Sequence, residues 1–177
     1  MRRLLLLLLI LAVAYIGYPY LTLYRIDQAL LNNDKAALEQ LVDFPQVRAD
    51  VRAGVKGQVL AKASEITKKR PILGTFGQAL TNLFAPDLVN SSVDAMVTAE
   101  GILENPTVAE HRRTGEGFAD FVTYAFFTSP TTFTAKLKDP DKPDSPTIGT
   151  VMKLDGFRWR VVGVDLPPLD DLLSKVP

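Results

Sequence analysis

The chain contains no cysteine, a single histidine and no excess of either charge. Without cysteine it can form no disulfide, no zinc–thiolate centre and no cysteine nucleophile. One histidine, His111, cannot supply a histidine metal cluster, so we expect neither a metal nor another cofactor. Lys+Arg and Asp+Glu each number 20 among the 177 residues, so the net charge is zero. No general attraction to nucleic acid follows, and nucleic acid is not an expected partner.

A long apolar run near the N-terminus is the strongest pattern in the chain. Residues 4–23 contain no charged side chain and directly follow Arg2 and Arg3. A helix of that length rises about 30 Å, the thickness of a hydrocarbon core. Cationic residues before such a run favour that end in the cytoplasm. We therefore expect residues 1–24 to form a single-pass membrane anchor, with residues 25–177 as one extracytoplasmic domain.

A cleaved secretory signal is the alternative interpretation of the same stretch. Leu4–Leu11 would be its apolar core, and Ala12-Val13-Ala14 matches the small-x-small cleavage pattern. Cleavage after Ala14 would release the domain after export. Both interpretations place the remainder outside the cytoplasm. In either case Pro19 is expected to kink or break the helix, unless it opens a new one.

Helical signals continue after the anchor. Asp34 is a suitable N-cap for a short helix, and Asp43 for a longer one with Pro45 in its first turn. We expect further helices over residues 72–84 and from Ser91, where Asp94 completes a capping-box pattern. Residues 107–117 are polar and are expected to form a surface loop or a short helical turn that carries His111.

Strand composition begins at Phe118, where Phe, Thr, Val and Tyr become frequent. Strands are expected over residues 118–128, 131–138, 147–154 and 157–165. Asp155-Gly156 is a strong hairpin signal, and a two-residue turn there pairs Lys153 with Arg158 and Met152 with Trp159. The prediction is an α+β domain in which four or five helices pack on the apolar face of an antiparallel sheet of three or four strands ending in a hairpin.

The opposite face of that sheet is basic. A like-charge pair such as Lys153 and Arg158 is unfavourable, so a face that tolerates it is a candidate for binding an anionic partner, either a lipid headgroup, a polysaccharide or an acidic protein. A simpler explanation is a solvated face whose lysines discourage aggregation. The candidate binding residues are Lys136, Lys138, Lys153, Arg158 and Arg160.

Other candidate sites have weaker support. A pocket between helices and sheet could be lined by Tyr124, Phe126 and Trp159. His111 could assist acid–base chemistry, but a single histidine in a polar segment is more simply a surface residue. The aspartates 139, 141 and 144 have calcium-loop spacing without the required glycine and glutamate, so no calcium site is expected.

Several segments resemble a known family. Residues 23–34 and 41–48, with the later pieces Asp94–Gly101 and Gly156–Pro167, are similar to the bacterial domain of unknown function 2939 family. The resemblance implies a small anchored or exported bacterial domain, hence the inner membrane and the periplasm, and it brings no catalytic residues. Helices followed by a Gly-Phe-x-Trp hairpin are more loosely similar to cone-shaped folds of the nuclear transport factor two-like kind.

These observations predict a non-catalytic, membrane-tethered periplasmic binding or accessory module. Its expected contacts are the membrane, through the N-terminal helix, and an envelope protein or anionic lipid, through the basic sheet face. The alternative is a cone-fold binder of small molecules, or an enzyme, with its pocket between helices and sheet. A structural spacer without a ligand also stays open.

Overall fold

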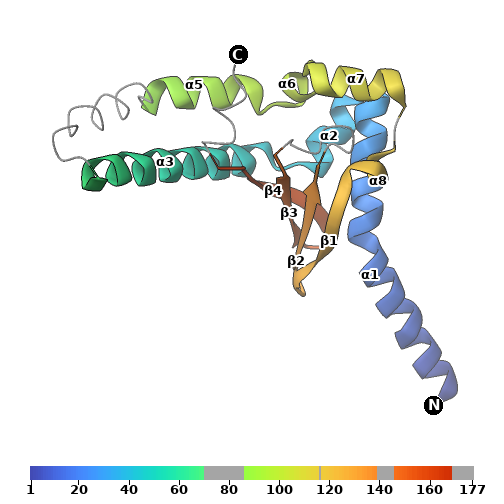
Figure 1. Ribbon diagram of the computed structural model, residues 1–177. Helices are drawn as coiled ribbons and strands as arrows, with labels where there is room; N and C mark the ends of the chain where they lie inside the picture. Colours follow the sequence, from blue (N-terminus) through green and yellow to red (C-terminus); the bar gives the residue numbers. More distant parts are fainter. Residues whose placement is uncertain (70–85, 116, 139–145, 169–177) are drawn as a thin grey trace.

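The computed structural model describes residues 1–69, 86–115, 117–138 and 146–168 (Figure 1). Helices form the first two thirds of the described chain, and an antiparallel sheet forms the last third. The α+β class predicted from the sequence is therefore confirmed. The helix expected over residues 72–84 and the three loop aspartates 139, 141 and 144 lie outside the described residues.

Helix α1 (Arg2–Leu31) has an exposed part and a packed part. Its apolar side chains up to Ile16 are exposed, whereas Thr22, Leu23 and Asp27 are buried against the rest of the domain. The helix neither ends nor restarts at Pro19, which lies buried inside it. A proline inside a helix costs about 3 kcal/mol, and the burial of the surrounding turn offsets that cost.

The two aspartate caps predicted from the sequence are confirmed. Asp34 caps α2 (Lys35–Leu41), where its Oδ1 accepts a hydrogen bond of 2.9 Å from the Ala37 N–H. Asp43 precedes α3 (Phe44–Lys69), and its Oδ1 accepts one of 3.2 Å from the Gln46 N–H. Each bond satisfies a backbone donor that the first turn of a helix leaves unpaired.

The predicted helix start at Ser91 is wrong. Helix α5 (Pro86–Met96) begins before Ser91, which lies inside it. The cap signal comes later, at Thr98, whose Oγ1 accepts a 2.9 Å hydrogen bond from the Gly101 N–H at the start of α6 (Ala99–Leu103). A serine three residues before an aspartate also occurs within helices, so this pattern alone does not fix a boundary.

The polar segment over residues 107–117, expected as a surface loop or a short helical turn, is mostly helical. Helix α7 (Pro106–Thr114) is capped by Asn105 and ends at Gly115, whose φ of 69° is favourable only for glycine. Helix α8 (Phe118–Phe121) follows, so the first predicted strand begins four residues too early. Helix α7 lies beside the end of α1, which places His111 against that helix rather than in solvent (Figure 1).

The sheet contains β1 (Val122–Ser129), β2 (Thr132–Leu137), β3 (Ile148–Asp155) and β4 (Arg158–Asp165), all antiparallel and in sequence order. The edge of β4 is covered, because Val42 bridges Val161 and the Asp50 carboxylate accepts a 3.0 Å hydrogen bond from the Val164 N–H. This arrangement protects one edge of the sheet from pairing with another chain.

The register predicted for the last hairpin is wrong, because its two-residue turn lies one residue further along the chain. Asp155 pairs with Arg158, so the turn residues are Gly156 and Phe157, and Lys153 faces Arg160 instead of Arg158. Gly156 has a φ of 58°, whereas the φ of Phe157 is not positive. This combination fits a type II′ turn with glycine first, whereas the prediction assumed Asp-Gly as both turn residues. From Leu154 to Met152 each partner moves by two positions, so these residues keep their predicted faces. Between Met152 and Val151 a further register shift moves the partner by one more position.

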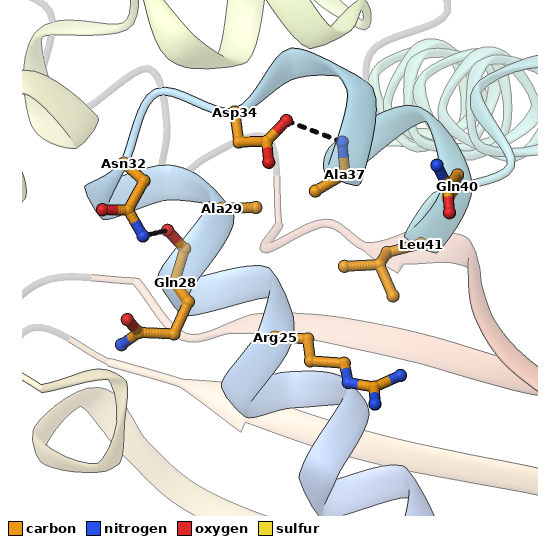
Figure 2. Close-up of a pocket in the computed structure, with 8 residues that line it drawn as sticks. All are labelled: Arg25, Gln28, Ala29, Asn32, Asp34, Ala37, Gln40 and Leu41. Atoms are coloured by element: carbon orange, nitrogen blue, oxygen red, sulfur yellow. Dashed lines mark hydrogen bonds between the residues drawn. The ribbon is translucent and has the colours of Figure 1, made fainter.

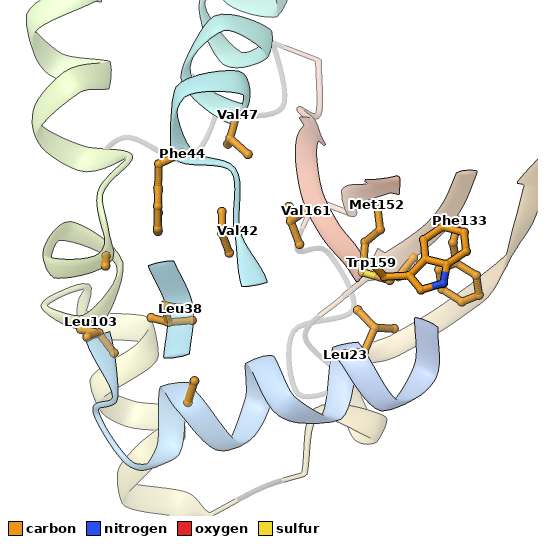
Figure 3. Packing of buried hydrophobic residues seen from close by; sticks show 13 residues of the cluster. Leu23, Leu38, Val42, Phe44, Val47, Leu103, Phe133, Met152, Trp159 and Val161 are labelled. Carbon is orange, nitrogen blue, oxygen red and sulfur yellow. The ribbon is translucent and has the colours of Figure 1, made fainter. Parts of the chain in front are cut away.

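The core lies between one face of the sheet, here called the inner face, and the helices α1, α2, α3 and α6 (Figure 3). Phe133, Met152 and Trp159 are fully buried there, and Leu23 of α1 packs with them. The Tyr20 ring of α1 meets Phe133 edge-on, with centroids 4.9 Å apart. The prediction that the helices pack on the apolar face of the sheet is thus confirmed, although the phenylalanine buried there is Phe133. The opposite face, which carries Lys136 and Lys153, is called the outer face.

Substituting Gly101→Ala is expected to lower the free energy of unfolding by about 1–3 kcal/mol, as overpacking does. An added Cβ would lie 2.5 Å from the Met96 carbonyl oxygen and 2.8 Å from that of Ala95, both backbone atoms of α5. Gly57→Ala in α3 is the matched control, because nothing lies within 4 Å of its added Cβ. That variant should be stabilised by roughly 0.5–1 kcal/mol. Urea denaturation measures both, and equal effects would contradict the packing argument.

Candidate functional site

The first contact between α1 and the sheet is made by Tyr15. The Tyr15 ring stacks on Phe127 with centroids 5.9 Å apart, and its hydroxyl donates to the Pro130 carbonyl oxygen between β1 and β2. Residues 1–14 are exposed, and α1 as a whole is long and apolar enough to be a membrane span or a signal sequence. The candidate cleavage site after Ala14 falls where packing begins, so anchor and signal both remain possible.

Arg160, one of the five predicted anion-binding residues, has a structural role. Its Nη1 donates to the Asp43 Oδ2 at 3.1 Å, and its Nη2 donates to the Val42 carbonyl oxygen at 3.3 Å. Both partners belong to the segment that joins α2 to α3. The guanidinium group therefore fixes the start of α3 on β4, and the Asp43 carboxylate already neutralises it.

The other four basic residues are only partly brought together. Lys153 is exposed on β3, and Arg158 lies opposite the Asp155 carboxyl group at the end of β4. Lys136 is exposed on β2. It lies four residues from Thr132, the residue that faces Lys153, and four residues span roughly 13 Å along a strand. Lys138 follows the end of β2 and is half-buried. The outer face thus has separated cations rather than one basic cluster.

The predicted pocket residues lie on opposite faces of the sheet. Tyr124 and Phe126 are 45% and 57% exposed on the outer face of β1, and the Lys136 Nζ lies 6.0 Å from the Tyr124 ring centroid. Trp159 is 1% exposed on the inner face, with its ring centroid 5.7 Å from that of Phe127. These three side chains do not line one pocket.

His111 is not the surface residue that the sequence favoured. Its Nε2 lies 2.8 Å from the Asp27 Oδ1, and the side chains are 12% and 6% exposed. The ring also meets Phe121 edge-on at 5.5 Å. Since a carboxylate only accepts hydrogen bonds, Nε2 is the donor. His111 Nδ1 is buried and has no hydrogen-bond partner among the described residues.

Sequence reasoning missed Asp27 as the partner of His111. Asp27 comes four residues after Leu23 and next to Ile26, on the apolar stripe of α1. A carboxylate within an apolar stripe needs a partner in the folded chain, because burying an unpaired charge is costly. That position was the available signal, although the sequence does not show which cation supplies the partner.

The basic flank of α3 is also occupied. Arg52 pairs with Asp94 of α5, and the Arg48 Nη1 donates to the Val97 carbonyl oxygen at 3.0 Å. The Arg48 Nε lies 3.5 Å from the Asp94 Oδ1. These contacts join α3 to α5. Lys35 of α2 similarly pairs with Glu100 of α6, and this hydrogen bond holds the pKa of Glu100 below its usual value and raises the pKa of Lys35.

A shallow, open hollow of about 240 Å³ lies between the end of α1 and α2 (Figure 2). Arg25, Gln28 and Gln40 supply its long polar side chains, and the Asp34 carboxylate is occupied by the Ala37 N–H. In the part of the chain that the structure describes, no three histidine or acidic side chains are close enough to hold a metal ion. The hollow offers hydrogen-bonding groups without an enclosed space.

Comparison with known proteins places the helical part of the chain in a family. No curated protein and no solved structure matches the chain, so the similarity to nuclear transport factor two-like folds is not confirmed. The family match covers α1 to α6, including Asp27, Asp94 and Gly101, but excludes the sheet and its Gly156–Pro167 segment. The chain belongs to the family described as protein of unknown function DUF2939, whose model matches residues 8–104 of its 177 residues.

Proposed function

We propose that the protein is a non-catalytic accessory module of the bacterial envelope. Helix α1 would anchor it in the inner membrane, and its domain would bind a periplasmic partner protein through the outer face of the sheet. The exposed aromatic pair Tyr124 and Phe126 is the observation that carries this proposal. Aromatic side chains left on one open face are enriched at protein interfaces, where their burial contributes to affinity.

The charge of the outer face favours an acidic partner. Lys136 and Lys153 are exposed, and the described residues provide neither with an ion pair. Arg158 and Lys138 add cationic character at the two ends of that face. Such groups at the rim of an interface steer association more than they add affinity. Arg160 is left out of the proposed surface because Asp43 neutralises it.

The absence of an enzymatic role is part of the proposal. The His111–Asp27 pair has the form of an oriented general base. However, no hydroxyl in the described chain hydrogen-bonds to His111 Nδ1, and α1, α7 and Phe121 surround the ring. This environment is what a structural pair requires, because it excludes water from the contact.

The test is recovery of partners from native membranes with the tagged full-length chain. The variant Lys136→Glu/Lys153→Glu should lower the amount of stoichiometric bound protein about tenfold or more, equivalent to about 1.4 kcal/mol of binding free energy. The control Lys56→Glu/Arg113→Glu makes the same change in net charge at exposed helix positions and should leave binding unchanged.

Two outcomes of this experiment would overturn the proposal. Equal loss of partner in both variants would indicate a response to net charge rather than to the outer face. Recovery of lipid alone, or of nothing, would favour an anionic lipid contact or a spacer without a ligand. Quantitative mass spectrometry of the bound fraction distinguishes these results.

A further inference from the structure

We propose that one end of the sheet is seated in the headgroup region of the membrane that holds α1. This end, here called the sheet tip, consists of the turn residues Pro130, Thr131, Gly156 and Phe157. The inference rests on the anchoring part of the proposed function. It assigns lipid as the contact of Phe157 and Arg158, and leaves Tyr124, Phe126, Lys136 and Lys153 to the partner protein.

Both turns of the sheet tip lie at the same level along α1. In an antiparallel sheet in sequence order, the β1–β2 and β3–β4 turns share one end, and the Leu154 N–H donates to the Thr131 carbonyl oxygen at 3.0 Å. The Tyr15 hydroxyl bonds to Pro130, which places the sheet tip beside Tyr15. Figure 1 shows α1 running on past this end of the sheet toward the N-terminus.

The length of helix beyond Tyr15 is too short to lift the sheet tip out of the membrane. Thirteen residues, Arg2–Ala14, project past the last contact with the sheet. At 1.5 Å per residue they rise about 20 Å, against a hydrocarbon core of about 30 Å. The side chains of Arg2 and Arg3 can extend toward the headgroups at the N-terminal end of α1, and the bilayer can thin locally. The remaining shortfall still places the sheet tip at the boundary between headgroups and acyl chains.

The chemistry of the sheet tip suits that boundary. Phe157 is 92% exposed at a turn position, where small or polar residues are usual. A phenyl ring gains free energy by entering the apolar side of an interface. Arg158 lies on the outer face at the same end, where lipid phosphates can accept its hydrogen bonds. Asp155, opposite Arg158, is the one carboxylate on these strand ends, and it stays exposed to water.

The absence of cysteine permits a direct test with single nitroxide labels. Phe157→Cys, Thr147→Cys and Leu9→Cys are each introduced into the full-length chain and reconstituted in vesicles of phosphatidylethanolamine and phosphatidylglycerol. Thr147 is an exposed control at the opposite end of β3, and Leu9 reports whether α1 spans the bilayer. Collision of the label with oxygen, which prefers lipid, is compared with collision with a water-soluble nickel chelate.

The expected oxygen-to-chelate ratio is several-fold higher at residue 157 than at residue 147, and highest at residue 9. An aqueous label at 157 with a lipid-exposed label at 9 would overturn the inference while leaving the anchor intact. An aqueous label at residue 9 would overturn the anchor and the inference together. Lipid exposure at both 157 and 147 would mean that the domain lies flat on the bilayer, which also contradicts contact through the sheet tip.

Discussion

Substituting His111→Ala is expected to lower the free energy of unfolding by about 3 kcal/mol, the upper end of the cost of leaving a buried hydrogen-bond acceptor unsatisfied. The Asp27 carboxyl group is 4% exposed and would lose its 2.8 Å contact with Nε2. The same substitution would open a gap against Phe121, whose ring packs edge-on against the imidazole. Since a folded domain of this size has only about 5–15 kcal/mol of stability, the effect should be visible at physiological temperature.

Arg113→Ala is the matched control on the same helix. The Arg113 side chain is 73% exposed, and its contact with Glu110 lies within α7. An exposed pair of this kind contributes about 0–1 kcal/mol, so the control should scarcely change stability. Equal costs for the two variants would show that the His111–Asp27 contact does not stabilise the fold. The double variant Asp27→Asn/His111→Ala should cost less than the sum of its two single substitutions, because they remove one shared interaction.

Local signals in the sequence predicted the helix starts at Asp34 and Asp43 because an N-cap depends on a backbone N–H only three residues away. His111 depends on a contact across 84 positions. A polar segment with one histidine carries no information about which helix it will meet, so its burial could not be read from the sequence. Asp27 was the only local indication, as a carboxylate on an apolar stripe.

The basic sheet face shows a different limit of sequence reasoning. The alternation of apolar and charged residues correctly divided the strands next to the hairpin turn into two faces. A register shift of two residues there does not change the face on which a side chain lies. It placed Lys153, Arg158 and Arg160 together on one face. It could not show that Asp43, from a segment more than a hundred residues earlier, neutralises Arg160. Strand periodicity reports which face a charge lies on, but not what covers it.

Composition and packing divide the N-terminal helix at different residues. The apolar run ends at Leu23, which suggested a boundary between anchor and domain near residue 24. Packing on the sheet begins at Tyr15, and Pro19 and Leu23 are buried, so these residues belong to both the apolar run and the packed domain. An apolar sequence does not distinguish contact with lipid from contact with a protein core, because both exclude water.

Removing residues 2–14 is expected to yield a soluble domain that unfolds cooperatively, whereas removing residues 2–31 should abolish folding. The shorter deletion removes exposed side chains only. The longer one removes Leu23, whose burial alone contributes about 1.5–3 kcal/mol, and leaves His111 without Asp27. Trp159 is the only tryptophan and lies in the core beside α1, so its fluorescence reports the loss of packing directly.

The comparison between the two deletions separates the roles of the two halves of α1. A cooperative transition in both would mean that α1 contributes nothing to the fold and that its contacts with the sheet are incidental. Aggregation of the shorter deletion would mean that the domain needs residues 2–14 to stay folded. With the expected result, cleavage after Ala14 and retention of the anchor would leave the same folded domain. The intact mass of the native protein then decides only whether that domain is tethered or released.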